Sequence, residues 1–183
     1  FIYFIIFSKG QYLLDDLGWS EYDNKYFTSA RYENICASSL GHSVPIINGA
    51  AQLPGLERKA STTFTEDRIS LDISAAYEVD KFTRDFIFQE DDSIVIEDYF
   101  ENEKLQITER FATRVKPELC EGGVKIGTLT VMCEGTCQVQ IFSQEFHPRA
   151  LGDLNTTETA YFVDFVFNET QAEQKVRILV KLS

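Results

Sequence analysis

Hydrophobic and polar residues alternate with a period of two along most of this chain. In residues 82–88, Phe82, Arg84, Phe86 and Phe88 occupy alternate positions, and Thr83, Asp85 and Ile87 stand between them. An acidic stretch at 90–93 follows, and the alternation resumes over 94–100. Alternating arms on either side of such a polar stretch predict a β-hairpin.

The same pattern predicts strands in most of the remaining sequence. Residues 62–77 contain two alternating arms around the turn 65–67, and 105–115 forms one strand that ends before Lys116-Pro117. Two more hairpins are predicted, the first from 128–133 with 137–142 and the second from 160–167 with 175–182. Helical periodicity is confined to short candidates, of which 20–30 is the main one.

This density of short strands is typical of a β-sandwich or a barrel. We predict an all-β protein, an antiparallel β-sandwich of about ten to twelve strands in two packed sheets. With 183 residues, no repeat and no Pro/Ser-rich linker, residues 1–183 are predicted to form a single domain.

Among the features of composition, the net charge does most to narrow the possible functions. The net charge of −12 and the absence of a Lys/Arg cluster exclude a basic nucleic-acid footprint. The apolar run 1–7 is much shorter than the roughly 20 residues that span a membrane, so we predict a buried strand there and no membrane partner. A chain that opens inside a strand, without Met, indicates a fragment, and the compartment stays open between a bacterial periplasmic or extracellular location and the cytoplasm.

The four cysteines leave two alternatives. Cys133 and Cys137 flank a predicted tight turn, but their spacing does not match a zinc motif. We expect ordinary reduced strand cysteines, with a disulfide across the hairpin as the alternative.

Asp16 and His42 form the first candidate site. Asp16 precedes Leu17-Gly18 at the end of a predicted strand, and His42 follows Gly41 at the start of another. A carboxylate and an imidazole are normal Zn²⁺ ligands, although two ligands alone do not hold the ion. The alternative is a His–Asp hydrogen bond that only orders a turn. His147, the second histidine, is expected to be an ordinary loop residue.

Aromatic residues and one arginine near this turn form a second candidate. Aromatic faces beside a guanidinium suit sugar rings and carboxylates, although the same residues could simply pack the turn against the sheet. Tyr22 is the preferred substrate-binding candidate, and the set comprises Trp19, Tyr22, Tyr26, Phe27, Arg31 and Tyr32. No nucleophile elbow, HExxH motif, phosphate loop or dinucleotide fingerprint accompanies them, so no catalytic residue is assigned.

Residues 1–55 resemble the C-terminal β-sandwich region of heparinase II/III-like polysaccharide lyases. The resemblance rests on Gly10, on the turn 13–18, on Tyr22, Tyr26-Phe27 and Arg31-Tyr32, and on 41–49 with Gln52. The later Glu109-Arg110-Phe111 resembles a common strand of that family.

The resemblance implies a lyase that breaks uronic-acid-containing glycans by β-elimination. In that family an upstream α/α toroid carries the catalytic tyrosine, and the sandwich lines the cleft. Asp16 and His42 then match ligands of a structural Zn²⁺ whose third ligand, a histidine, is expected upstream of residue 1. Asp15 is the alternative to Asp16 as the aspartate ligand. Asp16 is preferred because it directly precedes Leu17-Gly18, and because a shift of one residue along a strand would point the side chain to the opposite face.

The implied partners are an acidic polysaccharide and the toroid, and this chain alone is expected to be inactive. A non-catalytic carbohydrate-binding or structural sandwich is the alternative.

Overall fold

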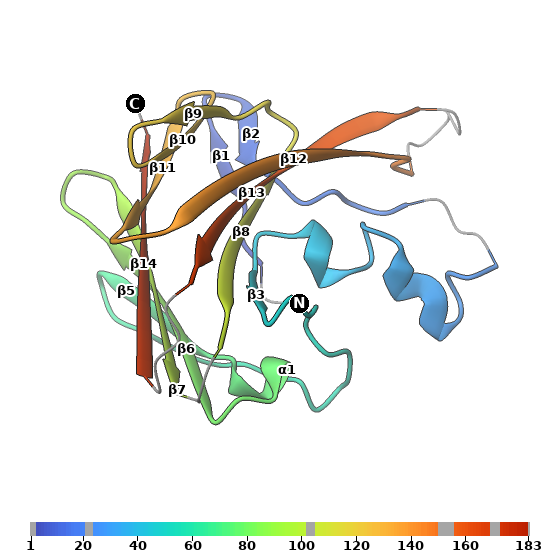
Figure 1. Cartoon of the computed structure of the whole chain (residues 1–183), viewed down its shortest axis with the longest axis horizontal. Helices are drawn as coiled ribbons and strands as arrows, with labels where there is room; N and C mark the ends of the chain where they lie inside the picture. The colour runs from blue at the N-terminus through green and yellow to red at the C-terminus, as the bar shows by residue number, and fades with distance from the viewer. Residues whose placement is uncertain (1–2, 21–23, 102–104, 150–155, 169–172, 183) are drawn as a thin grey trace.

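Strands arranged in three antiparallel sheets form almost all of the regular structure (Figure 1). The computed structural model describes residues 3–20, 24–101, 105–149, 156–168 and 173–182. Within these ranges there are fourteen strands, more than the ten to twelve expected, because several are only three or four residues long. The predicted class, an all-β antiparallel sandwich, is confirmed.

The largest sheet has eight strands, and all neighbouring pairs run antiparallel. In spatial order these are β4 (Ser61–Phe64), β5 (Arg68–Asp72), β6 (Lys81–Phe88), β7 (Ile94–Glu101), β14 (Glu173–Leu182), β11 (Leu129–Glu134), β10 (Gly123–Ile126) and β9 (Glu118–Cys120).

A four-stranded sheet packs against it, and a small two-stranded sheet lies near the N-terminus. The four-stranded sheet has the order β12 (Gln138–Phe146), β13 (Glu158–Phe167), β8 (Ile107–Thr113) and β3 (Pro45–Ile47), and the small sheet pairs β1 (Ile6–Ser8) with β2 (Gln11–Leu14). Helical structure among the described residues is limited to η1 (Ser29–Glu33), η2 (Ser39–Gly41) and α1 (Ser74–Tyr77).

The main hydrophobic core lies between the two larger sheets. Phe82 and Phe100 of the eight-stranded sheet are almost fully buried with Phe111 and Phe165 of the four-stranded sheet. Burial of alternate residues along each strand is the direct consequence of the period of two seen in the sequence.

An ion cluster also crosses this core. Arg84 on β6 donates from Nε to Asp98 on β7 at 2.8 Å, and from Nη2 to Glu109 on β8 at 2.5 Å. All three side chains are at most 2% exposed. Burial and the nearby Asp98 carboxylate raise the pKa of Glu109 well above its ordinary value, although the Arg84 guanidinium opposes the shift.

Two of the predicted hairpins are wrong in their pairing. The 82–88 and 94–100 hairpin exists as β6 and β7, but β11 and β12 belong to different sheets, and so do β13 and β14. The short connections 135–137 and 168–172 therefore join strands of opposite layers. Alternation identifies a strand, but it does not identify the neighbour with which that strand forms hydrogen bonds.

The expectation of reduced thiols is wrong for one cysteine pair. Cys133 and Cys137 form a disulfide, which was the alternative prediction for this pair. Cys36 and Cys120 are free thiols. Because β11 and β12 lie in different sheets, this bond closes the connection between the two layers rather than a hairpin turn.

The N-terminal apolar run and the predicted helix also differ from expectation. The strand begins only at Ile6, and Ile5 and Phe7 are 47% and 57% exposed, so it is not a buried strand. In the 20–30 range, the described residues 24–28 form turns, and a 3₁₀ helix begins at Ser29, where the Thr28 side chain accepts a hydrogen bond from Ala30. No helix in the described ranges has the length and apolar character to cross a bilayer.

Candidate functional site

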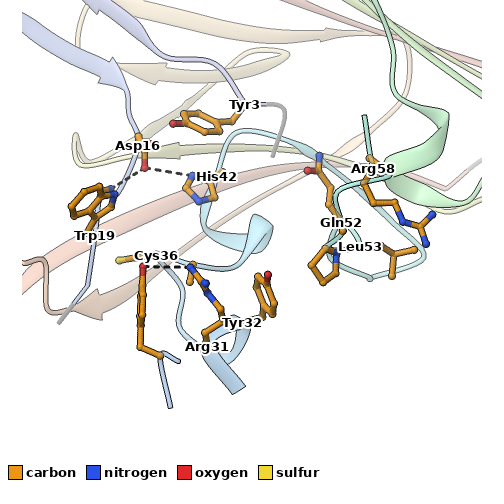
Figure 2. A pocket seen from close by; sticks show the side chains of 16 residues that line it. Tyr3, Asp16, Trp19, Arg31, Tyr32, Cys36, His42, Gln52, Leu53 and Arg58 are labelled. Atoms are coloured by element: carbon orange, nitrogen blue, oxygen red, sulfur yellow. Dashed lines mark hydrogen bonds and ion pairs between the residues drawn. The ribbon is translucent and has the colours of Figure 1, made fainter. Parts of the chain in front are cut away.

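Asp16 and His42 lie side by side, although they come from separate loops. The Nδ1 atom of His42 is 3.6 Å from the Oδ1 atom of Asp16. The His42 side chain is 5% exposed and that of Asp16 is 31% exposed, so the pair faces solvent mainly through the carboxylate. In Figure 2 the two side chains point toward one another, with Tyr3 alongside. The predicted juxtaposition is present in the structure.

Arg114, which follows β8, holds the turn that carries Asp16. Its guanidinium donates to the carbonyl oxygens of Asp16 and Leu17 at 3.0 and 2.9 Å, and it pairs with the Asp15 carboxylate. The Asp16 carboxylate instead accepts from the Gly18 amide at 2.9 Å and faces His42. The two carboxylates of the Asp15-Asp16 doublet therefore have separate partners, and Asp16 is the one beside the histidine.

Arg110 on β8 holds the turn that carries His42. It makes two hydrogen bonds to the Asp164 carboxylate, both at 2.7 Å, and a third to the Leu40 carbonyl at 2.9 Å. At Gly41 an added Cβ would lie 2.0 Å from the Ile35 carbonyl oxygen, so only glycine fits where η2 passes this backbone. His42 follows directly, and its position is therefore fixed from both sides.

The loops pack on the outer face of the four-stranded sheet. Leu17 and Cys36 from the loops form a second hydrophobic cluster with Ala112, Ala160 and Phe162 of the strands. The blue segment between β2 and β3 lies beside this sheet in Figure 1. A rigid sheet thus supports both turns that present the candidate ligands.

A cavity of about 410 Å³ opens between these loops. Asp16, Trp19, Arg31, His42 and Gln52 contribute to its walls, and Figure 2 shows them converging from different segments. This volume is within the usual range for small-molecule or sugar-sized pockets.

Electrostatics inside the cavity depend on burial and on Asp16. Burial lowers the pKa of His42, although the Asp16 carboxylate opposes the shift. A hydrogen bond to Asp16 raises the pKa of the Tyr3 phenol to about 12, and the Tyr3 ring stacks on the His42 ring at 4.9 Å. Burial raises the pKa of the Cys36 thiol to about 11, so this thiol is protonated near neutral pH.

The donor set suits part of a zinc site. Asp16 and His42 supply an oxygen and a nitrogen ligand, both of types that bind Zn²⁺. No group of three or more His, Cys, Asp or Glu side chains that could hold a metal occurs within the described ranges. His147 lies elsewhere, with its Nδ1 atom 3.4 Å from Thr157 Oγ1, and does not line this cavity.

The aromatic candidates divide into three groups. Trp19, Tyr26, Arg31 and Tyr32 line the cavity, whereas Phe27 is 79% exposed and does not. Tyr22, the substrate-binding candidate, lies outside the described residues.

Several residues of the site were not predicted. Tyr3 and Arg58 line the cavity, and Arg110 and Arg114 hold its loops. Arg110 was part of the Glu109-Arg110-Phe111 segment of the family resemblance. The four-residue spacing of Arg110 and Arg114 was a second signal, because it would place both on the same face of an extended strand.

Comparison with solved structures shows which proteins share this fold. A heparan sulfate lyase HepC mutant from Pedobacter heparinus matches with a TM-score of 0.67 and 13% identity over 96% of this chain and 29% of that chain. A heparinase III structure with methylated lysines matches with a TM-score of 0.72 and 12% identity, over 96% of this chain and 28% of that one. A further crystal structure of heparinase III gives a TM-score of 0.65 and 16% identity, over 93% of this chain and 27% of that one.

This chain has the fold of one part of heparinase III. The resemblance to heparinase II/III-like lyases is therefore confirmed at the level of the fold. The chain spans less than a third of the heparinase III and HepC chains that it matches. No protein-family model matches the sequence. No curated protein matches it either.

Proposed function

We propose that this chain is the C-terminal β-sandwich of a polysaccharide lyase that cleaves uronic-acid-containing glycans by β-elimination. The similar structures include a heparan sulfate lyase, and nearly the whole of this chain takes part in the match. In this proposal the sandwich braces an upstream toroid and lines the glycan cleft, while the toroid carries the catalytic tyrosine. The chain alone is then inactive as a lyase.

One observation carries the proposal. Asp16 and His42 are 3.6 Å apart at the wall of a cavity, on the fold of a known lyase. Arg110 of β8 and Arg114, directly after this strand, hold the two loops, so the framework of the fold supports the pairing of Asp16 with His42.

The same pair would hold a structural Zn²⁺ together with a third ligand from the segment before residue 1. A bound ion would tie the loops to that upstream segment and fix the geometry of the cleft. The substrate in this proposal is an acidic polysaccharide, and Tyr22 would contact it.

Zinc content provides the test. The chain, extended at its N-terminus by its natural upstream segment, is purified as wild type, as His42→Ala and as His147→Ala, and zinc per chain is measured by elemental analysis. We expect wild type and His147→Ala to retain about one zinc per chain, and His42→Ala to lose it, because an imidazole ligand is removed. Equal zinc in all three proteins would remove the metal proposal.

A non-catalytic carbohydrate-binding sandwich is the second candidate. Trp19 is 68% exposed at the cavity, which suits a stacking platform for sugar rings. The two candidate functions predict different behaviour of the longer protein to which this chain would belong. Release of unsaturated product from acidic glycans, followed by ultraviolet absorbance, supports the lyase, whereas glycan binding without product supports the binding module.

A further inference from the structure

Arg31 differs from most other arginines of the described chain. Six arginines pair with carboxylates, namely Arg58 with Glu78, Arg68 with Asp85, Arg84 with Asp98, Arg110 with Asp164, Arg114 with Glu158 and Arg177 with Glu97. Arg31 has no ion pair with any carboxylate of the described residues, and its buried Nε has no hydrogen-bond partner among them. In a chain with a net charge of −12, an arginine without a carboxylate partner is notable.

Aromatic rings fix the Arg31 side chain at the cavity wall. The guanidinium carbon lies 4.7 Å from the centre of the Tyr26 ring and 5.6 Å from that of Tyr32. Nη2 also donates to the Tyr26 hydroxyl at 3.5 Å. Stacking on aromatic faces positions a guanidinium without neutralising its charge.

The acidic residue of the same helix does not neutralise this guanidinium. Arg31 lies in the 3₁₀ helix η1, in which the Asn34 amide donates to the Arg31 carbonyl at 3.1 Å. Glu33, two residues later, pairs with Lys25 at 3.2 Å instead. The nearest acidic residue of the helix is thereby engaged elsewhere, and the positive charge of Arg31 faces the cavity.

The cavity also offers a surface for a sugar ring. Trp19 is the only tryptophan of the chain and lies in the same cavity wall, 68% exposed. Figure 2 shows Trp19 and Arg31 on the same side of the cavity. A flat aromatic face beside an unpaired guanidinium combines the two contacts that an acidic sugar needs, stacking for its ring and charge-assisted hydrogen bonds for its carboxylate.

We infer that Arg31, held over Tyr26 and Tyr32, binds the carboxylate of an acidic sugar residue whose ring packs against Trp19. This inference rests on the proposed function, because it assigns the residue of the cavity that holds the acid group of the proposed glycan. The acidic surface repels anions in general, so an acid group in the cavity needs a local cation. Arg58 also lines the cavity but pairs with Glu78, which leaves the Arg31 guanidinium for this contact. A neutral sugar of the same shape gains no such contact.

The fluorescence of Trp19 provides the readout, because no other tryptophan contributes to it. The probe is a tetrasaccharide of alternating glucuronate and N-acetylglucosamine, and its matched partner is the same tetrasaccharide with each carboxylate reduced to the alcohol. Both are titrated into the 183-residue chain as wild type, Arg31→Gln and Arg31→Lys. Arg68→Gln is the control, because it removes the same charge from an arginine on β5 that does not line the cavity. Circular dichroism and thermal unfolding check that each variant is folded.

We expect the wild type and Arg68→Gln to bind the acidic tetrasaccharide about tenfold more tightly than the reduced one, since hydrogen bonds to charged groups contribute this much. Arg31→Gln should lose that preference, and Arg31→Lys should retain only part of it, because an ammonium cannot make the paired contacts of a guanidinium. Equal preference in wild type and folded Arg31→Gln would overturn the inference and leave the lyase proposal standing. Absence of binding to both sugars would overturn it as well, whereas the zinc measurement tests the proposed function separately.

Discussion

Glu109 is a carboxyl group in the middle of a hydrophobic core. It shares that core with one guanidinium, Arg84, and a second carboxylate, Asp98. If both carboxyl groups were ionised, the cluster would carry an unbalanced negative charge away from water, which is costly. Burial and the charge of Asp98 raise the pKa of Glu109, so the cluster is neutral when Glu109 keeps its proton.

This protonation state has a defined effect on stability. In the unfolded chain a glutamate releases its proton near pH ~4.3, whereas folded Glu109 retains it to a higher pH. Above that pH the native state binds one proton more than the unfolded state. The free energy of unfolding therefore falls by about 1.4 kcal/mol for each pH unit, until the folded carboxyl also ionises. The stabilisation is fully present at low pH and is lost as the pH rises.

Glu109→Gln removes the titrating group and nearly preserves the shape of the side chain. We expect its free energy of unfolding to rise relative to wild type by about 1.4 kcal/mol per pH unit from about pH 5 upward. Urea denaturation at a series of pH values measures the difference, and other titrating groups cancel because both proteins share them. Glu145→Gln, at an exposed position on β12, is the control and should show no such trend. Parallel curves for Glu109→Gln and wild type would refute the reasoning.

Three further predictions follow from individual contacts. Arg84→Met leaves two buried carboxyl groups without their cation, and urea denaturation at neutral pH should show a loss of about 3–5 kcal/mol, while a loss below about 1 kcal/mol would contradict the cluster. Gly41→Ala places a Cβ 2.0 Å from the Ile35 carbonyl oxygen, and thermal unfolding should show a destabilisation of about 1–3 kcal/mol, which an unchanged melting temperature would disprove. Alkylation of the denatured chain without reductant should spare Cys133 and Cys137 and modify the other two cysteines, whereas modification of all four would exclude the disulfide.

The class of fold was predictable because it depends on local signals. Alternation over 82–88 and 94–100 fixed two strands and their hairpin, which the structure contains as β6 and β7. The pairing of later strands was not predictable in this way. Glu134 and Gln138 are only four residues apart, yet the strands that they end and begin lie in opposite sheets. Which sheet a strand joins is decided by long-range packing, and a short polar connection suits a crossing between layers as well as a hairpin.

The candidate site was predictable to a different extent. Asp16 and His42 each stand at a turn beside a strand, and the family resemblance related them to each other. The residues that hold those turns were hidden, because Arg110 and Arg114 follow His42 by about seventy residues and look like ordinary polar positions of an alternating strand. Arg84 alternates with Phe82 and Phe86 and so shares their face, but its charge gave no sign that it lies in the core.

Strand β8 connects the core to the cavity through its alternation. Glu109 faces the core, where it meets Arg84, while Arg110 points to the other face and holds Leu40 in the turn before His42. A shift of β8 by one residue against β13 would exchange these faces, placing Arg110 in the core and Glu109 under the loops. The buried ion cluster and the Arg110–Asp164 pair both oppose such a shift, because each would leave charged groups without partners. The polar residues of this strand therefore fix its register, and that register in turn fixes the distance between Asp16 and His42.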